Sequence, residues 1–276
     1  MENIETNENY HFSLKLKNSL PWLIPVFLIA FWQVACNLSW VNETLLPSPI
    51  DVVTNGIKLF KKGELQENMS ISLYRATAGL LIGGGLGFVL GFINGVSHTT
   101  RLLFDSTIQM LRNIPHLALI PLIILWLGIG ESAKISLVAL GCLFPMYINT
   151  YHGITSVDPK LIEMGKSYEL SKKDLFVKVI FPGALPTILM GVRYALGVMW
   201  TTLIVAETIS ASSGIGYMST NAEQFMDMKT IVLCILIYAL LGKSSDFIAK
   251  NLEDIFLEWR AIERRDTNGS EASGDK

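Results

Sequence analysis

The chain has 276 residues and a formal net charge of −2; half of the residues are hydrophobic and only 17% are charged. An ordinary soluble domain carries about 25% charged residues, so the composition argues against that class, and the net charge gives no attraction for nucleic acid. The charges cluster, and Asp, Glu, Lys and Arg are absent from residues 18–42, 76–100, 113–130 and 135–157. A helix needs about 20 apolar residues to cross a bilayer core of roughly 30 Å, so these lengths indicate an integral membrane protein.

We expect an all-α membrane protein with six transmembrane helices, which form one domain over residues 20–260. The predicted spans are Leu20–Cys36, Leu73–Val96, Ile114–Ile129, Ala133–Tyr151, Pro186–Ile209 and Met228–Ile248. The last span is charge-free only over residues 230–242, so we expect Lys243 near a membrane interface. Residues 1–19 form a polar tail without the cleavage site of a removed signal peptide, and residues 261–276 form a second polar tail that is predicted to be disordered.

Basic residues predict the orientation of the chain. Six spans place both termini on one side, together with most of the Lys and Arg residues between the spans. We assign to the other side Lys58, Lys61, Lys62, Lys134 and Lys229. Because basic loops stay in the cytoplasm, we expect a multi-pass membrane protein with both termini cytoplasmic.

The second predicted span carries a glycine at every fourth position, at Gly79, Gly83, Gly87, Gly91 and Gly95. This spacing places the glycines on one helix face, where a neighbouring backbone can approach closely. A dinucleotide-binding glycine loop is the competing interpretation, but such a loop follows a strand, and this segment is apolar throughout. We therefore expect a helix-packing ridge.

Two prolines mark the third predicted span, Pro115 and Pro121. Each removes a backbone donor, so we expect this helix to be kinked or partly unwound. Unwound backbone at membrane depth faces protein or a water-filled cavity. A kink that serves only helix packing is an equally open alternative.

A long polar segment, residues 155–185, separates the fourth and fifth spans on the predicted cytoplasmic side. Asp158 followed by Pro159 is typical of a helix start, with a capping side chain and a first-turn proline. A short amphipathic helix here could bind a cytosolic partner, and a solvated loop is the alternative. The segment contains Gly165-Lys166-Ser167, but Lys160 stands where a phosphate-binding loop needs its first glycine, so we expect no ATP site.

The fifth span supplies hydroxyl groups without a positive charge in its central turns, at Thr201, Thr202, Thr208 and Ser210. If this span lined a path for an anion, neutral donors would bind that anion weakly enough for it to leave. We expect Thr201 or Thr202, which point about 100° apart, to line a translocation path, and Arg193 not to hold the anion. Arg193 and Glu207 lie about 21 Å apart along the helix, so they cannot pair, and we expect structural roles near opposite interfaces.

Catalytic and metal-binding patterns are not found in the sequence. The three cysteines (Cys36, Cys142, Cys234) lie far apart in apolar stretches, and the four histidines are scattered. We expect no catalytic residue, no metal and no cofactor. A secondary transporter or channel is the first alternative function, and a membrane-embedded enzyme is the second.

The polar segment resembles the cytoplasmic coupling motif of ABC importer permeases, which opens with Glu-Ala-Ala, turns at a glycine and closes with Leu-Pro. Glu163 matches the opening acid, and Leu185-Pro186 matches the close. Met164 and Gly165 replace the alanines, and Glu169 replaces the glycine. The sharp turn that a glycine allows must then be made differently.

The resemblance extends over residues 46–259. Residues 46–49, 112–121, 126–131 and 207–217 resemble the branch that imports sulfonates, taurine, nitrate and related anions, and within it the aliphatic-sulfonate permeases. This likeness implies the type I ABC importer permease fold, a place in the bacterial cytoplasmic (inner) membrane, and the ATP-driven import of a small organic anion, above all an aliphatic sulfonate. A taurine permease or a nitrate/bicarbonate permease is the alternative within the branch.

The same resemblance implies partners. Two permease copies would form a homodimer in the lipid bilayer, and an extracytoplasmic binding protein would deliver the substrate. Two cytosolic ABC ATPase subunits would use ATP and magnesium, so the chain itself would not be an enzyme. They would dock on Glu163, Met164, Gly165, Ser167, Tyr168, Glu169, Leu170 and Ser171.

Overall fold

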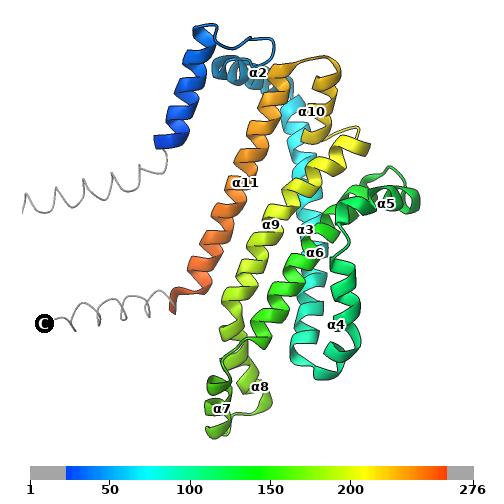
Figure 1. Cartoon of the computed structure of the whole chain (residues 1–276), viewed down its shortest axis with the longest axis vertical. Helices are drawn as coiled ribbons and strands as arrows, with labels where there is room; N and C mark the ends of the chain where they lie inside the picture. Colours follow the sequence, from blue (N-terminus) through cyan, green and yellow to red (C-terminus); the bar gives the residue numbers. More distant parts are fainter. Residues whose placement is uncertain (1–22, 260–276) are drawn as a thin grey trace, which may run out of the picture. The chain divides into compact units, whose positions relative to one another are not determined.

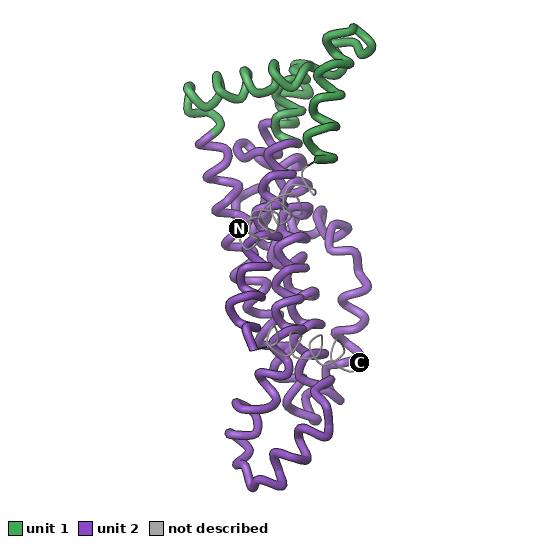
Figure 2. The backbone as a smooth tube through the Cα atoms, turned by 90° about the vertical axis from the view of Figure 1, so that its left-hand side faces the viewer, with its two compact units in different colours: residues 1–65, 219–235 green, residues 66–218, 236–276 purple. Residues whose placement is uncertain are grey.

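A computed structural model describes residues 23–259, and within them the regular structure is helical, without a β-strand (Figure 1). The predicted all-α fold is confirmed. The two predicted tails, residues 1–19 and 261–276, lie outside the described residues. The chain divides into two compact units, residues 1–65 with 219–235 and residues 66–218 with 236–276, which Figure 2 distinguishes by colour.

The described chain is a series of helices of very different lengths. Four helical stretches are long and apolar enough to cross a membrane: Glu64–Val96, Glu131–Thr155, Lys172–Ile209 and Met228–Phe256. They correspond to the second, fourth, fifth and sixth predicted spans. In chain order the elements are helix Leu23–Asn37, α2 Pro49–Lys62, α3 Glu64–Val96, α4 His98–Arg112, a 3₁₀ turn His116–Leu119, α5 Ile120–Leu127, α6 Glu131–Thr155, α7 Pro159–Ser167, α8 Lys172–Leu175, a π turn Phe176–Ile180, α9 Phe181–Ser210, α10 Ile215–Gln224 and α11 Met228–Phe256.

The third predicted span differs from the prediction. Instead of one helix over residues 114–129, the structure has a 3₁₀ turn followed by α5, and together these are bent by 82° from α4. Pro115 stands before the 3₁₀ turn and Pro121 stands in the first turn of α5, where a missing N–H leaves no hydrogen bond unmade. The break that the prolines predicted is therefore present, but as a sharp bend in a broken span.

Among the described residues, four of the six predicted spans are present as single long helices. The residues described contain four candidate spans, or five if the bent pair counts as one. Helix Leu23–Asn37 covers most of the first predicted span and is apolar, but its described length is shorter than a straight crossing needs. The first residues of that predicted span, 20–22, lie outside the described part.

Helix α6 lies between α3 and α9 in unit 2 and packs on both through glycines. On the α3 side, a Cβ atom on Gly87 would collide with the Leu143 carbonyl, and one on Gly91 would lie 2.6 Å from the Tyr147 carbonyl. The other three ridge glycines meet α6 in the same way, with Gly79 against Val138, Gly83 against Ala139 and Gly95 against Ile154. The predicted ridge therefore faces a single helix, and its backbone approaches α6 too closely for any side chain.

The opposite side of α6 packs along α9. A Cβ atom on Gly153 would lie 2.8 Å from the Ala184 carbonyl, so the two backbones are again close. Apolar side chains from α3, α6, α9 and α11 form a buried cluster that includes Cys142 and Leu203. Trp200 belongs to this cluster, and its buried indole donates a hydrogen bond of 2.7 Å to Ser245 Oγ of α11. Close packing therefore holds the helices of unit 2 together.

Candidate functional site

Helix α7 is built as the sequence predicted, with a cap and a first-turn proline. The Asp158 side chain accepts a hydrogen bond of 2.9 Å from the Lys160 amide, and Pro159 is the first helical residue. Three apolar side chains of the segment are exposed: Leu161 to 43%, Met164 to 51% and Tyr168 to 76%. Their spacing of three and four places them on one face, which is the pattern of a helix that binds a partner through that face.

The predicted docking residues divide into an outer and an inner group. Gly165 is buried, and a Cβ atom there would lie 2.5 Å from Leu175 of α8, so α7 packs closely on α8. Leu170 is half-buried and follows the turn between the two helices. The remaining predicted docking residues are exposed, and these are Glu163, Met164, Ser167, Tyr168, Glu169 and Ser171.

The turn after α7 corrects one prediction. We expected the chain to make this turn differently because Glu169 stands where the resembling motif has glycine. Instead, Glu169 itself adopts the left-handed conformation, with a φ of 55°, and its amide donates a hydrogen bond of 2.9 Å to the Lys166 carbonyl. A side chain in this conformation costs about 1–2 kcal/mol, which a glycine would avoid. Ser171 then caps α8 by accepting a hydrogen bond from the Asp174 amide.

A buried arginine at the other end of unit 2 joins two carboxylates. Arg75 of α3 is fully buried, and its Nη1 lies 2.7 Å from Glu207 Oε1 of α9. The same guanidinium makes a two-pronged contact with Glu131 at the start of α6, through Nε and Nη2 at 2.6 Å each. Glu207 is 1% exposed, whereas the Glu131 side chain is 52% exposed and also contacts Lys134 Nζ at 3.0 Å.

The same cluster holds the loop that follows α9. Arg75 Nη1 donates a hydrogen bond of 2.6 Å to the Ser213 carbonyl, and Glu207 Oε2 accepts one of 2.9 Å from the Gly216 amide. Gly214 has a φ of 109°, and a Cβ atom there would collide with the Glu207 carboxylate, so glycine is required at this position. Ser72 Oγ donates to Glu207 and accepts from the Ile215 amide at 2.9 Å. The cluster therefore connects α3, α6 and α9 to the entry of α10.

The charges of this cluster are balanced. Arg75 and Lys134 are cationic, Glu131 and Glu207 are anionic, and each contacts a group of opposite charge. Buried charges are costly unless they are paired and hydrogen-bonded, and removing one partner strands the other. This arrangement indicates a structural role, in which the ion pairs hold the helices together. Glu207 is occupied by Arg75, so it does not offer the site that a transported coupling ion would need.

This pairing was not predicted from the sequence. Glu207 shares its predicted span with Arg193, and Arg75 lies in the first turn of the predicted second span. An ionisable residue inside a span requires a partner, so the coexistence of Arg75 and Glu207 in two predicted spans was the signal that could have found the pair.

The hydroxyl groups predicted to line a path are not brought together. Thr202 is fully buried, and its Oγ1 lies 2.9 Å from His116 Nε2. Thr201 and Thr208 are exposed, and each donates a hydrogen bond of 3.0 Å to a carbonyl one turn earlier in α9. Ser210 ends α9, and its side chain is outside the described part. Of the adjacent pair Thr201 and Thr202, only Thr201 therefore faces outward from the helix bundle of unit 2.

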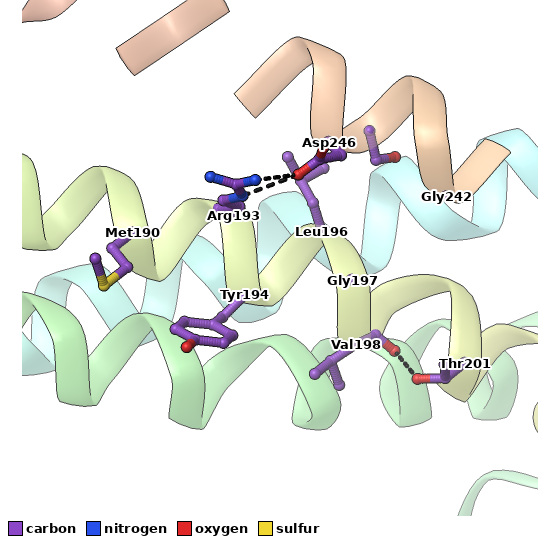
Figure 3. A pocket seen from close by; sticks show the side chains of 10 residues that line it. Met190, Arg193, Tyr194, Leu196, Gly197, Val198, Thr201, Gly242 and Asp246 are labelled. Atoms are coloured by element: carbon purple, nitrogen blue, oxygen red, sulfur yellow. Dashed lines mark hydrogen bonds and ion pairs between the residues drawn. The ribbon is translucent and has the colours of Figure 1, made fainter. Parts of the chain in front are cut away.

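A pocket of about 510 Å³ lies between α9 and α11 and brings Thr201 and Arg193 to one surface (Figure 3). Arg193 Nε and Nη2 donate hydrogen bonds of 2.9 and 2.6 Å to Asp246 Oδ1, so the positive charge is paired. The rest of the lining is mainly apolar and includes Met190 and Tyr194. Within residues 23–259, His, Cys, Asp and Glu side chains do not gather in groups of three or more that could hold a metal ion.

Comparison with known proteins gives concordant matches. Residues 83–254 match the family described as the binding-protein-dependent transport system inner membrane component. The chain is 56% identical over 239 residues to a putative aliphatic sulfonates transport permease protein of Escherichia coli (strain K12), a match that covers 87% of this chain and 91% of that protein. A protein of the same description from Bacillus subtilis (strain 168) is 45% identical over 238 residues, with 86% of each chain covered.

Among solved structures, the chain is similar to the crystal structure of an amino acid ABC transporter with histidines. The match covers 73% of this chain and 95% of that chain, with a TM-score of 0.54 and 17% sequence identity. At this identity the likeness concerns the fold alone. It agrees with the all-helical architecture described above.

Proposed function

This chain belongs to the family of binding-protein-dependent transport inner membrane components, and from that premise we propose that it is the permease subunit of an ATP-driven importer of aliphatic sulfonates. The identity of 56% to a relative that is described as a sulfonate permease supports the substrate class. A permease of this kind spans the membrane several times and leaves ATP hydrolysis to separate subunits.

The exposed apolar face of α7 is the observation that carries the coupling part of the proposal. Leu161, Met164 and Tyr168 lie on one face of a short helix, and Glu163 is exposed beside them. A soluble helix seldom keeps such a face in water unless a partner covers it. We assign this face to the cytosolic ATPase, with the buried Gly165 setting how closely α7 rests on α8.

The remaining partners follow from this assignment. If α7 contacts a cytosolic ATPase, then the polar segment and both termini are cytoplasmic, as the basic residues predict. A binding protein would deliver the sulfonate from the other side. A second permease copy would complete the translocation path, and Thr201, which is exposed on α9, is the hydroxyl that we assign to that path.

The experiment that tests the coupling assignment measures ATP hydrolysis by the complete complex in lipid vesicles. With the parent permease, a binding protein loaded with an alkanesulfonate should stimulate the ATPase. Glu163→Lys should abolish this stimulation because it reverses a charge within the docking face. Glu67→Lys, which reverses an exposed charge on α3, should retain it. Full stimulation in the Glu163→Lys complex would show that the ATPase docks elsewhere.

A further inference from the structure

The place of helix α2 in the chain predicts that it lies at a membrane boundary. It connects the apolar helix Leu23–Asn37 to the candidate span α3, with only Gly63 between α2 and α3. A segment that links two apolar helices emerges at the surface of the bilayer, because lipid cannot satisfy an irregular backbone. Both α2 and helix Leu23–Asn37 belong to unit 1, which is green in Figure 2.

One face of α2 is fixed to the first turns of α11, in the same unit. Asn55 Nδ2 donates a hydrogen bond of 2.8 Å to Thr230 Oγ1, and the Asp51 carboxylate lies 3.4 Å from Lys229 Nζ. A Cβ atom on Gly56 would lie 3.1 Å from Leu233 Cδ1, so the two helices are close. Since α11 is a candidate span, these contacts hold α2 beside the point where a second span begins.

A second face of α2 is apolar and exposed. Ile50, Val53 and Ile57 are 65%, 59% and 52% exposed, and their spacing of three and four places them in one stripe along the helix. At 100° per residue, this stripe is separate from the face that carries Asn55 and Gly56. Packing within the chain therefore covers one face of α2 but does not cover the Ile50–Val53–Ile57 stripe.

The side of α2 between the stripe and Asn55 carries positive charge. Lys58, Lys61 and Lys62 are exposed, and Lys62 Nζ lies 3.9 Å from the Glu64 carboxylate. The Asp51 carboxylate is compensated by Lys229, so the end of α2 keeps a net positive charge. Lysine stems can extend from an apolar boundary so that their ammonium groups reach lipid phosphates.

We propose that α2 is an interfacial helix whose Ile50–Val53–Ile57 stripe inserts into the bilayer while Lys58, Lys61 and Lys62 bind the headgroups of anionic phospholipid. An apolar stripe beside a lysine-rich face is the pattern of a helix that lies in the plane of the membrane surface. A stable protein partner would bury about 800 Å² on each side, far more than three aliphatic side chains of this size offer. Bound lipid would thereby fix the first turns of α11 at a set depth.

Site-directed fluorescence on the full-length permease tests this proposal. Ile57→Cys and Lys58→Cys place a thiol on the stripe and on the charged face of the same helix, and both positions are exposed, so the fold tolerates the label. The variants carry bimane and are reconstituted in phosphatidylcholine vesicles with about one phosphatidylglycerol in three lipids. The parent protein, whose described cysteines are buried, is treated with the same reagent to give the background.

The two labels should respond oppositely to quenchers. Nitroxide-labelled lipid should quench the Ile57→Cys label several-fold more than the Lys58→Cys label, and aqueous iodide should show the reverse order. Replacing Lys58, Lys61 and Lys62 together with Gln in the Ile57→Cys protein should reduce lipid quenching in the anionic vesicles to the value in pure phosphatidylcholine. These quenching ratios require neither the ATPase nor a substrate. Their outcome is therefore independent of whether the chain transports sulfonates.

Three results would overturn the proposal. Equal iodide quenching at both positions would place the stripe in water. Protection of the Ile57→Cys label from both quenchers would place it against a second copy of the chain. Lipid quenching that appears only without the binding protein would assign the stripe to that protein.

Discussion

The buried Arg75 offers the sharpest test of how unit 2 is held together. Replacing Arg75 with Met keeps an unbranched side chain of similar length but removes the guanidinium, which contacts Glu207, Glu131 and the Ser213 carbonyl. Glu131 can return to water because its side chain is half exposed. Glu207 cannot, because it is buried, so the substitution leaves one unpaired carboxylate inside the protein.

The expected loss follows from what remains around Glu207. Breaking a buried ion pair by removing one partner costs about 3–5 kcal/mol. Ser72 Oγ, the Gly216 amide and the Tyr238 hydroxyl still donate to the carboxylate, so we expect a loss near the lower end, about 3 kcal/mol. For a chain of this size, that corresponds to a fall in Tm of roughly 6–12 °C.

The assay is thermal unfolding of the purified permease in detergent, with two comparisons. Arg193→Met removes an arginine from an exposed pair with Asp246 and should change Tm little, because exposed pairs contribute little. The double variant Arg75→Met/Glu207→Gln should be more stable than Arg75→Met alone, because it buries no unpaired charge. If Arg75→Met unfolds at the same temperature as Arg193→Met, the cluster does not stabilise the fold and our reasoning is wrong.

Three further predictions concern single positions. Gly87→Leu should lower Tm and the yield of folded protein because the new side chain would collide with α6. Gly85→Leu should lower neither, because a Cβ atom on Gly85 has no neighbour within 4 Å. Equal Tm values for the two variants would contradict the close approach of α3 and α6. Glu169→Gly should raise the free energy of unfolding by about 1 kcal/mol because glycine adopts the left-handed φ without strain, and chemical denaturation measures this; an unchanged or lower stability would mean that the turn is unstrained. Thr201→Cys should react with a thiol-reactive anion and Thr202→Cys, buried against His116, should not, on a background without the native cysteines; the opposite order of labelling would exclude Thr201 from the path.

The sequence predicted the parts of the fold that depend on local spacing. The charge-free stretches 76–100 and 135–157 coincide with two helices of membrane-spanning length, because bilayer thickness and helix rise determine that length. Asp158 and Pro159 gave the start of α7 to the residue, because a cap and a first-turn proline act within one turn. The four-residue glycine spacing likewise identified the face of α3 that meets α6.

Features that depend on distant residues were not predicted. Arg75 pairs with carboxylates 56 and 132 residues away, and no local pattern encodes such a contact. Helix α4 contains Arg101, Asp105 and Arg112, so it did not resemble a membrane segment, although it forms a bent pair with α5. The left-handed Glu169 shows tertiary structure overriding a local preference for glycine.

The most direct test of the transport assignment is uptake of a radiolabelled alkanesulfonate into vesicles that hold this permease with its ATPase, in the presence of the binding protein. We predict that the sulfonate accumulates inside the vesicles only when the ATPase subunits face the interior and ATP is supplied to them. The Glu163→Lys permease should still insert into the membrane but should not accumulate the sulfonate. Taurine and nitrate should accumulate less. Accumulation of the sulfonate without ATP, or ATP-driven accumulation of nitrate while the sulfonate stays at the background level, would contradict the account.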